Sequence, residues 1–156
     1  MEKFMKRIVF VCHGNICRSP MAEFVFKRIA LERGRSADFE VSSMAVSNEE
    51  LGNPVYPPAK AELLRHGISC DGKYAVQITR NDYHRFDHII CMDDSNVRYL
   101  MRILGGDPDS KVKKLLDFTP RGGDVADPWY SGNFEETYKD VCRGCEAVYA
   151  ALTESL

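Results

Sequence analysis

The chain has 156 residues, of which 44% are hydrophobic and 28% are charged, and these proportions are typical of one soluble globular domain. Its formal net charge of −2 argues against a nucleic-acid-binding surface, which would require an excess of basic residues. The opening MEKFMKRIVFVC contains too short an apolar run for a signal peptide or a membrane span. We therefore expect a cytoplasmic protein that binds neither nucleic acid nor membrane.

Apolar runs alternate with helical patterns along the chain, which is typical of an α/β domain with a parallel sheet. In chain order we expect a strand at 7–12, a helix at 19–34, a strand at 39–46, a helix at 59–67, a strand at 87–92, a helix at 93–105, a short edge strand within 111–118, and a helix from 134 to the C-terminus. The prediction is a single domain over residues 1–156, with four parallel strands and helices on both faces.

A short polar loop joins the first strand to the first helix, with Cys12 at one end and Arg18 at the other. Gly14 and Asn15 can adopt positive φ at low cost, so successive backbone N–H groups can turn inward above a helix N-terminus. Arg18 adds a planar set of donors suited to phosphate. The loop therefore has the features of a site for a tetrahedral anion.

Cys12 can act as a nucleophile in this loop only as a thiolate, whereas a free thiol with a pKa near 8.5 is mostly protonated at neutral pH. A helix dipole stabilises a thiolate by at most about 2 kcal/mol, which is not enough to lower the thiol pKa sufficiently. The loop N–H groups, the Ser19 hydroxyl and Arg18 must supply the remaining stabilisation of the thiolate. The simpler interpretation is a buried cysteine at a strand end. The G-N pair inside the loop and the S-P pair after it disfavour that interpretation.

The segment VCHGNICRSPMAE closely resembles the signature of low-molecular-weight protein tyrosine phosphatases. HGI at 66–68, FDHIICMDDSN at 86–96 and DPWYSG at 127–132 resemble further family segments, in the family's order. The resemblance implies a phosphotyrosine protein phosphatase I-like fold. It also implies hydrolysis of phosphotyrosine in proteins, or of small aryl phosphates, without a metal or another cofactor.

The resemblance also assigns catalytic roles to individual residues. Cys12 is the expected nucleophile and forms a cysteinyl-phosphate. Asp127 is the expected general acid and later general base, and it must carry a proton before the attack. Phosphate oxygens are expected to be bound by the loop residues His13, Gly14, Asn15, Ile16, Cys17 and Arg18.

Trp129 and Tyr130 are expected to wall the pocket and to stack on the phosphotyrosine ring. Ser19 is expected to hydrogen-bond the thiolate, with a helix cap as its alternative role. The resemblance further implies that the Ser43 hydroxyl holds Asn15 in its loop-shaping position.

Two further roles stay open at this point. Asp93 either supports Arg18 or caps the helix that follows it. Cys17 is either a packing residue or the partner of Cys12 in a reversible disulfide formed on oxidation. Cys142 and Cys145 form a C-x-x-C pair, but they lie in a predicted helix without a second pair, which disfavours a zinc site.

The chain departs from the family pattern at several positions. Lys73 stands where the family often has a histidine, and Val76 stands where it often has an arginine. Glu49 replaces an aromatic residue on the pocket rim, and an acidic rim should disfavour acidic phosphopeptides. His13 follows the nucleophile, where an apolar residue is more usual.

Three alternative functions remain. A protein arginine phosphatase on the same fold is disfavoured by Ile16, because that branch has threonine at this position. A thiol-dependent arsenate reductase would need further shuttle cysteines, and Cys70 and Cys91 are poorly placed for that role. A non-catalytic phosphoprotein-binding module would not need the full set of catalytic residues. We expect a monomer or weak self-association.

Overall fold

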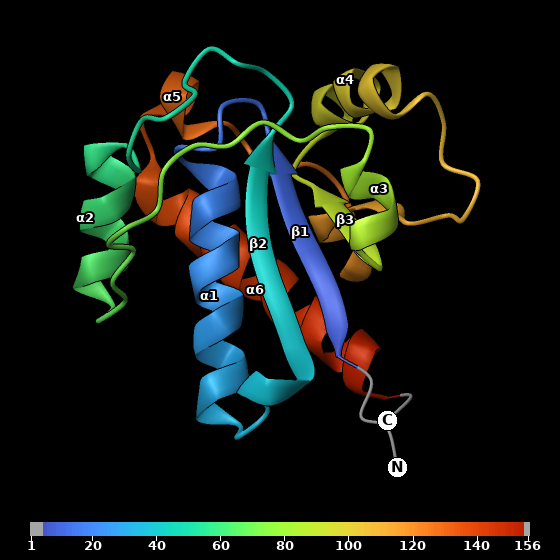
Figure 1. Ribbon diagram of the computed structural model, residues 1–156. Helices are drawn as coiled ribbons and strands as arrows, with labels where there is room; N and C mark the ends of the chain where they lie inside the picture. The colour runs from blue at the N-terminus through green and yellow to red at the C-terminus, as the bar shows by residue number, and fades with distance from the viewer. Residues whose placement is uncertain (1–4, 155–156) are drawn as a thin grey trace.

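The computed structural model describes residues 5–154, and its centre is a four-stranded sheet (Figure 1). The strands are β1 (Lys6–Cys12), β2 (Phe39–Ala45), β3 (His88–Cys91) and β4 (Val112–Lys114). They are all parallel and run in the order β2-β1-β3-β4. The predicted fold class is confirmed. The ends of the predicted domain, residues 1–4 and 155–156, lie outside the described residues.

The longer helices follow the prediction closely, and several short ones were not predicted. The helices are α1 (Arg18–Glu32), α2 (Pro57–Arg65), α3 (Asp82–Arg85), α4 (Asp94–Leu104), α5 (Pro128–Ser131) and α6 (Phe134–Thr153), with 3₁₀ turns η1 (Ser36–Asp38) and η2 (Leu115–Phe118). The sequence patterns did not reveal α3 and α5, because four residues are too few to establish a helical period. None of the helices within residues 5–154 is long and apolar enough to cross a membrane.

The predicted edge strand at 111–118 is only three residues long, and η2 takes over at Leu115. Leu115 and Leu116 are both buried in the same hydrophobic cluster. A strand would point two consecutive side chains to opposite faces of the sheet. The 3₁₀ turn instead directs both leucines toward the core under α6.

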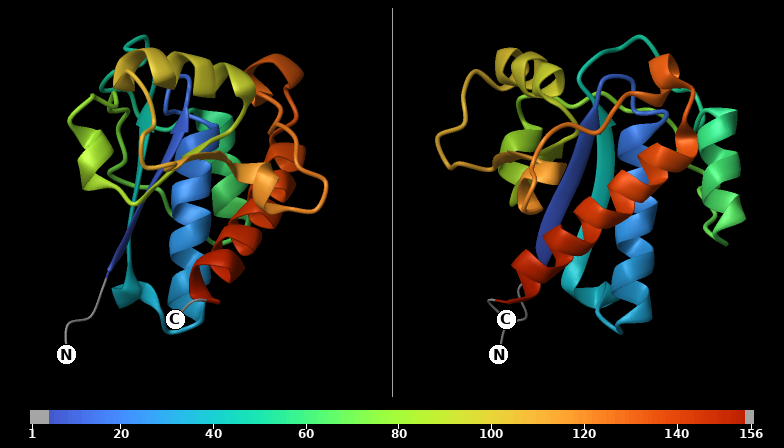
Figure 2. Two further views of the ribbon diagram at one scale, coloured as in Figure 1. Left: turned by 90° about the vertical axis from the view of Figure 1, so that its right-hand side faces the viewer. Right: turned by 180° about the vertical axis from the view of Figure 1, so that it is seen from behind.

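Helices lie on both faces of the sheet (Figure 2), and strand β1 separates two hydrophobic cores. Ile8 and Phe10 face the core that α1 and α6 cover, whereas Val9 and Val11 face the core that α3 and α4 cover. All four side chains are fully buried. This two-sided burial explains why the strand is continuously apolar rather than alternating.

The carboxyl ends of β1, β2 and β3 lie at one edge of the sheet, which is the upper edge in Figure 1. Since β1 and β3 are neighbours, with Val11 opposite Cys91, the loop after Cys12 lies beside the start of α4. The connection after β1 leads to β2 on one side, and the connection after β3 leads to β4 on the other side, so the chain diverges between β1 and β3. Such a switch point is where open α/β sheets bind their ligands.

Candidate active site

Cys12 is the last residue of β1, and three hydrogen-bond donors converge on its sulfur. The backbone N–H groups of Asn15 and Ser19 donate to Cys12 Sγ at 3.3 and 3.4 Å. The Ser19 hydroxyl lies 3.0 Å from the same atom. Because Cys12 is only 3% exposed, these donors take the place of water in stabilising negative charge on the sulfur.

A series of hydrogen bonds determines where the Ser19 hydroxyl points. The Val76 backbone N–H donates to Asn15 Oδ1 at 3.1 Å, so Asn15 Nδ2 faces Ser19 and donates to its Oγ at 2.8 Å. Since the Ser19 oxygen accepts from Asn15, its own hydrogen is available to the Cys12 sulfur. The alternative role of Ser19 as a helix cap is wrong, because the N-cap of α1 is Cys17.

The prediction that Ser43 holds Asn15 is also wrong, because the Ser43 hydroxyl donates to Glu23 Oε1 at 2.6 Å. Glu23 is buried, and its other oxygen accepts from Lys27 Nζ at 2.5 Å. A buried carboxylate binds a hydroxyl proton more strongly than a neutral amide oxygen does. Lys73 lies in the same cluster and donates to the Ser43 carbonyl at 2.8 Å, and burial lowers its pKa.

The Cys12–Arg18 loop turns its carbonyl oxygens outward. Its four outward carbonyls accept hydrogen bonds of 2.9–3.2 Å from the N–H groups of Met21, Val46, Ser47 and Tyr56. A trans peptide places each N–H opposite the preceding C=O. The N–H groups that follow these carbonyls therefore point away from these four partners, which leaves them available to an anion bound by the loop.

The two residues expected to use positive φ contribute differently. Asn15 does adopt the left-handed conformation, with φ of 59°. Gly14 does not, and its small size matters for another reason. A Cβ added to Gly14 would lie 3.2 Å from the Glu50 side chain, so a larger residue would crowd the rim.

Arg18 is held in a fixed orientation by the loops that follow β3 and β4. Its Nη1 donates to Asp93 Oδ2 at 2.7 Å and to the Val125 carbonyl at 2.9 Å, and its Nη2 lies 3.5 Å from Asp127 Oδ2. Burial alone would lower the pKa of Arg18, but the negative groups around it, Cys12 and Asp93 first, raise it. The guanidinium therefore stays charged.

Asp93 fulfils both of the roles left open by the sequence. One carboxylate oxygen binds Arg18, and the other accepts the Asn96 N–H at 2.7 Å at the N-terminus of α4. The Asn96 side-chain oxygen in turn accepts a hydrogen bond from the Asp93 N–H at 3.2 Å, which completes a capping box. The orientation of Arg18 is thus tied to the start of a helix.

Asp127 is the N-cap of α5, and its Oδ1 accepts the Trp129 N–H at 3.0 Å. The Val125 N–H donates to the Met92 carbonyl at 2.9 Å, which attaches this loop, residues 119–133, to the end of β3. The attachment places the Asp127 carboxylate beside Arg18, at 3.5 Å from its Nη2.

A cavity of about 280 Å³ brings most of the predicted site residues together. It is lined by Cys12, His13, Gly14, Ile16, Cys17, Arg18, Glu49, Glu50, Asp127, Trp129 and Tyr130. Of the predicted set, Asn15, Ser19 and Ser43 do not line the cavity and lie behind it. Trp129 and Tyr130 are 56% and 87% exposed, so they border the mouth.

The acidic rim expected from Glu49 is anchored to the loop by His13. His13 Nε2 lies 3.0 Å from Glu49 Oε2, and Ser47 binds the His13 carbonyl through both its N–H and its hydroxyl. The histidine ring also packs edge-on against Tyr99, at 5.9 Å between centroids. The His13 side chain is therefore held in place by a polar contact with Glu49 and a ring contact with Tyr99.

Cys17 differs from Cys12 in its surroundings, although both line the cavity. Burial and then the negative charge of Cys12 raise the pKa of Cys17 to about 12. Cys17 is therefore a neutral thiol at physiological pH. Cys142 and Cys145 lie in α6, and Cys145 is fully buried against α1, with its Sγ 3.5 Å from the Ala22 carbonyl.

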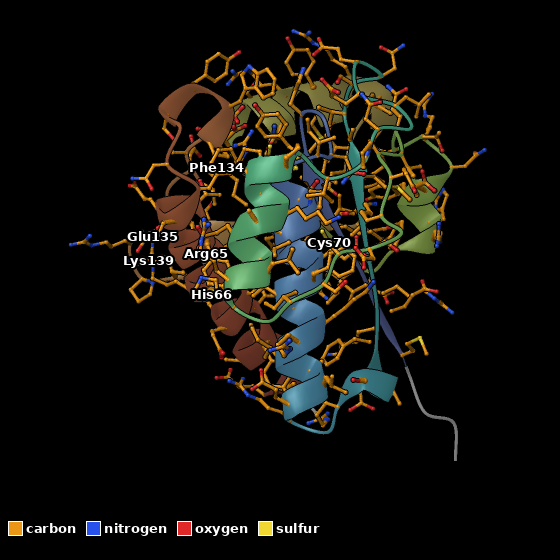
Figure 3. All side chains as sticks on the ribbon, turned by 90° about the vertical axis from the view of Figure 1, so that its left-hand side faces the viewer. Arg65, His66, Cys70, Phe134, Glu135 and Lys139 are labelled. Carbon is orange, nitrogen blue, oxygen red and sulfur yellow. The ribbon has the colours of Figure 1, made fainter. Side chains whose placement is uncertain are left out.

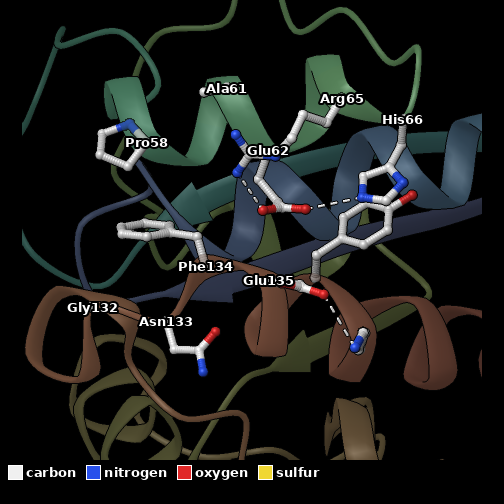
Figure 4. Close-up of a pocket in the computed structure, with 11 residues that line it drawn as sticks. Pro58, Ala61, Glu62, Arg65, His66, Gly132, Asn133, Phe134 and Glu135 are labelled. Carbon is white, nitrogen blue, oxygen red and sulfur yellow. Dashed lines mark hydrogen bonds and ion pairs between the residues drawn. The ribbon is translucent and has the colours of Figure 1, made fainter.

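A larger cavity of about 770 Å³ lies between α2 and α6 (Figures 3 and 4), and Cys12 is not among the residues that line it. Its buried carboxylate, Glu62, accepts hydrogen bonds from Arg65 and His66 at 2.5 and 2.9 Å. The His66 ring stacks on Tyr138 at 3.8 Å between centroids. Glu62, Arg65 and His66 bind one another, and the residues lining the cavity include no cysteine, so we place the chemistry at the smaller cavity.

Tyr56 and Glu23 are the residues of this region that sequence reasoning missed. Tyr56 binds the Cys12–Arg18 loop through its backbone and contacts Trp129 through its ring. The segment Y-P-P is typical of a turn, so no local pattern distinguishes this tyrosine. Glu23 has an ordinary place in a helix, and only its burial identifies it.

Comparison with known proteins agrees with this geometry. A family model described as low molecular weight phosphotyrosine protein phosphatase matches residues 7–156. Low molecular weight protein-tyrosine-phosphatase YfkJ of Bacillus subtilis is 39% identical over 150 residues, covering 95% of this chain and 96% of the relative. The crystal structure of YfkJ covers 97% of this chain and 96% of its own, with a TM-score of 0.93 and 38% identity.

A more distant structural neighbour is the YwlE arginine phosphatase, in a cysteine-to-serine mutant with a phosphorylated active-site serine. It has a TM-score of 0.83 and 26% identity, and it covers 95% of this chain and 96% of its own. Both the sequence match and the structural match extend over nearly the full length. The chain therefore belongs to the low molecular weight phosphotyrosine protein phosphatase family.

Proposed function

We propose that this member of the phosphatase family hydrolyses phosphotyrosine in proteins, with Cys12 as nucleophile and Asp127 as general acid and base. The observation that carries the proposal is the convergence of three donors on a buried Cys12 sulfur, in a cavity shared with Arg18 and Asp127. Donors that stabilise an anionic sulfur also suit the oxygens of a phosphate.

In the first step, the Cys12 thiolate attacks phosphorus in line with the bond to the tyrosine oxygen. The S–P bond forms as the P–O bond breaks, and the bond's electron pair goes to the leaving oxygen. Asp127 donates its proton to that oxygen, so the product leaves as neutral tyrosine. Arg18 and the inward N–H groups bind the three remaining phosphoryl oxygens as negative charge shifts among them.

In the second step, water attacks phosphorus and the S–P bond breaks. Asp127, now a carboxylate, accepts a proton from the water, which returns it to its starting state. The electron pair returns to sulfur, where the Ser19 hydroxyl and the Asn15 N–H stabilise the released thiolate. Inorganic phosphate then leaves the cavity.

The walls of the cavity favour an aryl substrate over phosphoarginine. Ile16 lines the cavity and is 8% exposed, so it presents an apolar surface beside the sulfur. Trp129 and Tyr130 at the mouth offer aromatic faces for a phenyl ring. The arginine phosphatase activity named for the YwlE neighbour is the main alternative, because its fold is the same. In the YwlE mutant, the serine that replaces the active-site cysteine is phosphorylated. This supports a covalent phosphoryl intermediate at Cys12 in the present chain.

A comparison of four reactions tests the proposal. We expect turnover of p-nitrophenyl phosphate and of a phosphotyrosine peptide, little turnover of phosphoarginine, and no arsenate reduction. Cys12→Ser should abolish turnover, and a pure binding module would show no turnover in the wild type. Faster turnover of phosphoarginine than of phosphotyrosine would contradict the assignment. Because one group must be ionised and the other protonated, kcat/KM should pass through a maximum at acidic pH.

The same site carries a proposal for redox control. Hydrogen peroxide would oxidise the Cys12 thiolate to a sulfenic acid, and the Cys17 thiol would then displace water to form a disulfide. Cys17, with its raised pKa, would react as the second thiol rather than as the first target. Activity lost to peroxide should return with dithiothreitol in the wild type and return less completely in Cys17→Ser. Equal recovery would contradict the disulfide.

A further inference from the structure

Tyr56 connects the two segments that carry the proposed catalytic groups. Its backbone N–H donates to the Ile16 carbonyl in the Cys12–Arg18 loop at 2.9 Å. Its ring lies 4.9 Å from the Trp129 ring, between centroids, at an angle of 52°. Trp129 is two residues after Asp127 and donates its N–H to the Asp127 carboxylate. In Figure 1, α5 accordingly lies close to the start of α2.

The segment that carries Asp127 has few other side-chain contacts with the rest of the molecule. Within residues 126–133, Pro128 is the only buried residue, and α5 is a single turn. The Tyr56 ring also lies 6.0 Å from Phe134, the first residue of α6, so it contacts both α5 and the start of the helix that follows it. Figure 4 shows Phe134 pointing toward α2.

We propose that Tyr56 is a positioning residue for the general acid: its ring holds Trp129 and so sets the reach of Asp127 toward the leaving oxygen. The inference rests on the proposed role of Asp127. A displacement of about 1 Å at a catalytic group can reduce a rate about 100-fold. The loss of one aromatic contact in a single-turn helix is therefore enough to change the position of Asp127 and lower the rate.

The reaction responds to a misplaced acid in a characteristic way. A poor leaving group such as phenolate needs a proton as the P–O bond breaks, whereas p-nitrophenolate leaves readily without one. Loss of Asp127 positioning should therefore slow phenyl phosphate far more than p-nitrophenyl phosphate. A defect in the Cys12–Arg18 loop or in the fold would slow both equally.

The experiment compares Tyr56→Leu, which removes the ring, with Tyr56→Phe, which keeps it. We expect kcat/KM for phenyl phosphate to fall roughly 10- to 100-fold in Tyr56→Leu, and that for p-nitrophenyl phosphate to change by less than about 3-fold. Tyr56→Phe should match the wild type. Tyr138→Leu is the matched control, because Tyr138 is another partly buried tyrosine between α2 and α6, and its ring stacks on His66 instead.

A second measurement does not depend on activity, because Trp129 is the only tryptophan in the chain. Its time-resolved fluorescence anisotropy should show added fast motion in Tyr56→Leu and none in Tyr56→Phe or Tyr138→Leu. If Tyr56→Leu does not fold, Tyr56→Met fills more of the space and is measured in the same way. Equal losses on both substrates, or unchanged rates and anisotropy, would overturn the inference.

Asp127→Asn separates failure of this inference from failure of the proposed function. If Asp127 is the general acid, Asp127→Asn should slow phenyl phosphate about 10²- to 10⁴-fold and reproduce the leaving-group pattern of Tyr56→Leu. If Asp127→Asn shows no such pattern, the proposed function fails at Asp127. If it does and Tyr56→Leu does not, only the positioning role fails.

Discussion

Replacing Asp93 by asparagine or by alanine separates its two contacts, with Arg18 and with the start of α4. Asparagine keeps an oxygen that can accept the Asn96 N–H and is a good N-cap, but it removes the negative charge beside Arg18. Alanine removes both contacts. The two variants therefore form a series in which first the ion pair and then the cap is lost.

The geometry gives the expected sizes of the two losses. Breaking a buried ion pair costs about 3–5 kcal/mol when one charge is left unpaired. Arg18, 3% exposed, keeps the Val125 carbonyl and Asp127, so we expect about 1.5–3 kcal/mol, the range for one hydrogen bond to a charged group. The cap adds about 1 kcal/mol. Asp93→Asn should thus lose about 1.5–3 kcal/mol and Asp93→Ala about 1 kcal/mol more.

Urea unfolding measures both losses, because an m value of about 2 kcal/mol/M converts each 2 kcal/mol into a midpoint shift of about 1 M. Both variants should also show a lower kcat/KM, since the Arg18 fork loses one of its fixed partners. An Asp93→Asn protein as stable as the wild type would refute the charge argument. Equal stability of the two variants would refute the cap.

Three further predictions concern other parts of the chain. Because the pKa of Cys17 is raised to about 12, iodoacetamide at pH 7 should label Cys12 first. The labelling rate of Cys12 should be the same in Cys17→Ser as in the wild type, and preferential labelling of Cys17 would contradict this prediction. Gly144→Ala should lose about 1–3 kcal/mol, because its Cβ would overlap a buried leucine of η2, and the double variant with that leucine shortened to alanine should recover part of the loss. Burial alone would raise the pKa of Glu62, but hydrogen bonds from its helical neighbours lower it, so its stabilisation is present above about pH 4.3 and is lost as the pH falls further. Glu62→Gln should flatten that acid-side decline in urea unfolding, and an unchanged slope would contradict the assignment.

The strand, the Cys12–Arg18 loop and helix α1 could be predicted from sequence because their determinants are local. The sulfur, Asn15 and Ser19 lie within eight consecutive residues, and their contacts follow from one strand-loop-helix geometry. Strand burial likewise follows from a continuous apolar run. By contrast, Arg18 and Asp93 are 75 positions apart, and only the adjacency of β1 and β3 brings them together.

The prediction at Ser43 was wrong because a buried carboxylate competes with Asn15 for the Ser43 hydroxyl. The family resemblance alone does not reveal this competing acceptor. Glu23 is buried, so its carboxylate must collect donors, and it takes the Ser43 hydroxyl and the Lys27 ammonium. Asn15 is then left to the backbone N–H of Val76, which any residue type except proline would provide.

Two contacts support the loop although the histidine and the arginine expected from the family resemblance are absent. Support for Asn15 comes from a backbone group, so the change from arginine to Val76 removes a side chain without removing the hydrogen bond. Lys73 supplies a donor to the Ser43 carbonyl and a positive charge 3.7 Å from Glu23. A buried ammonium is costly to keep charged, and burial lowers its pKa. With Lys73 and Val76 at these positions, the nearest donors to the Cys12 sulfur, the Asn15 and Ser19 groups, are still in place.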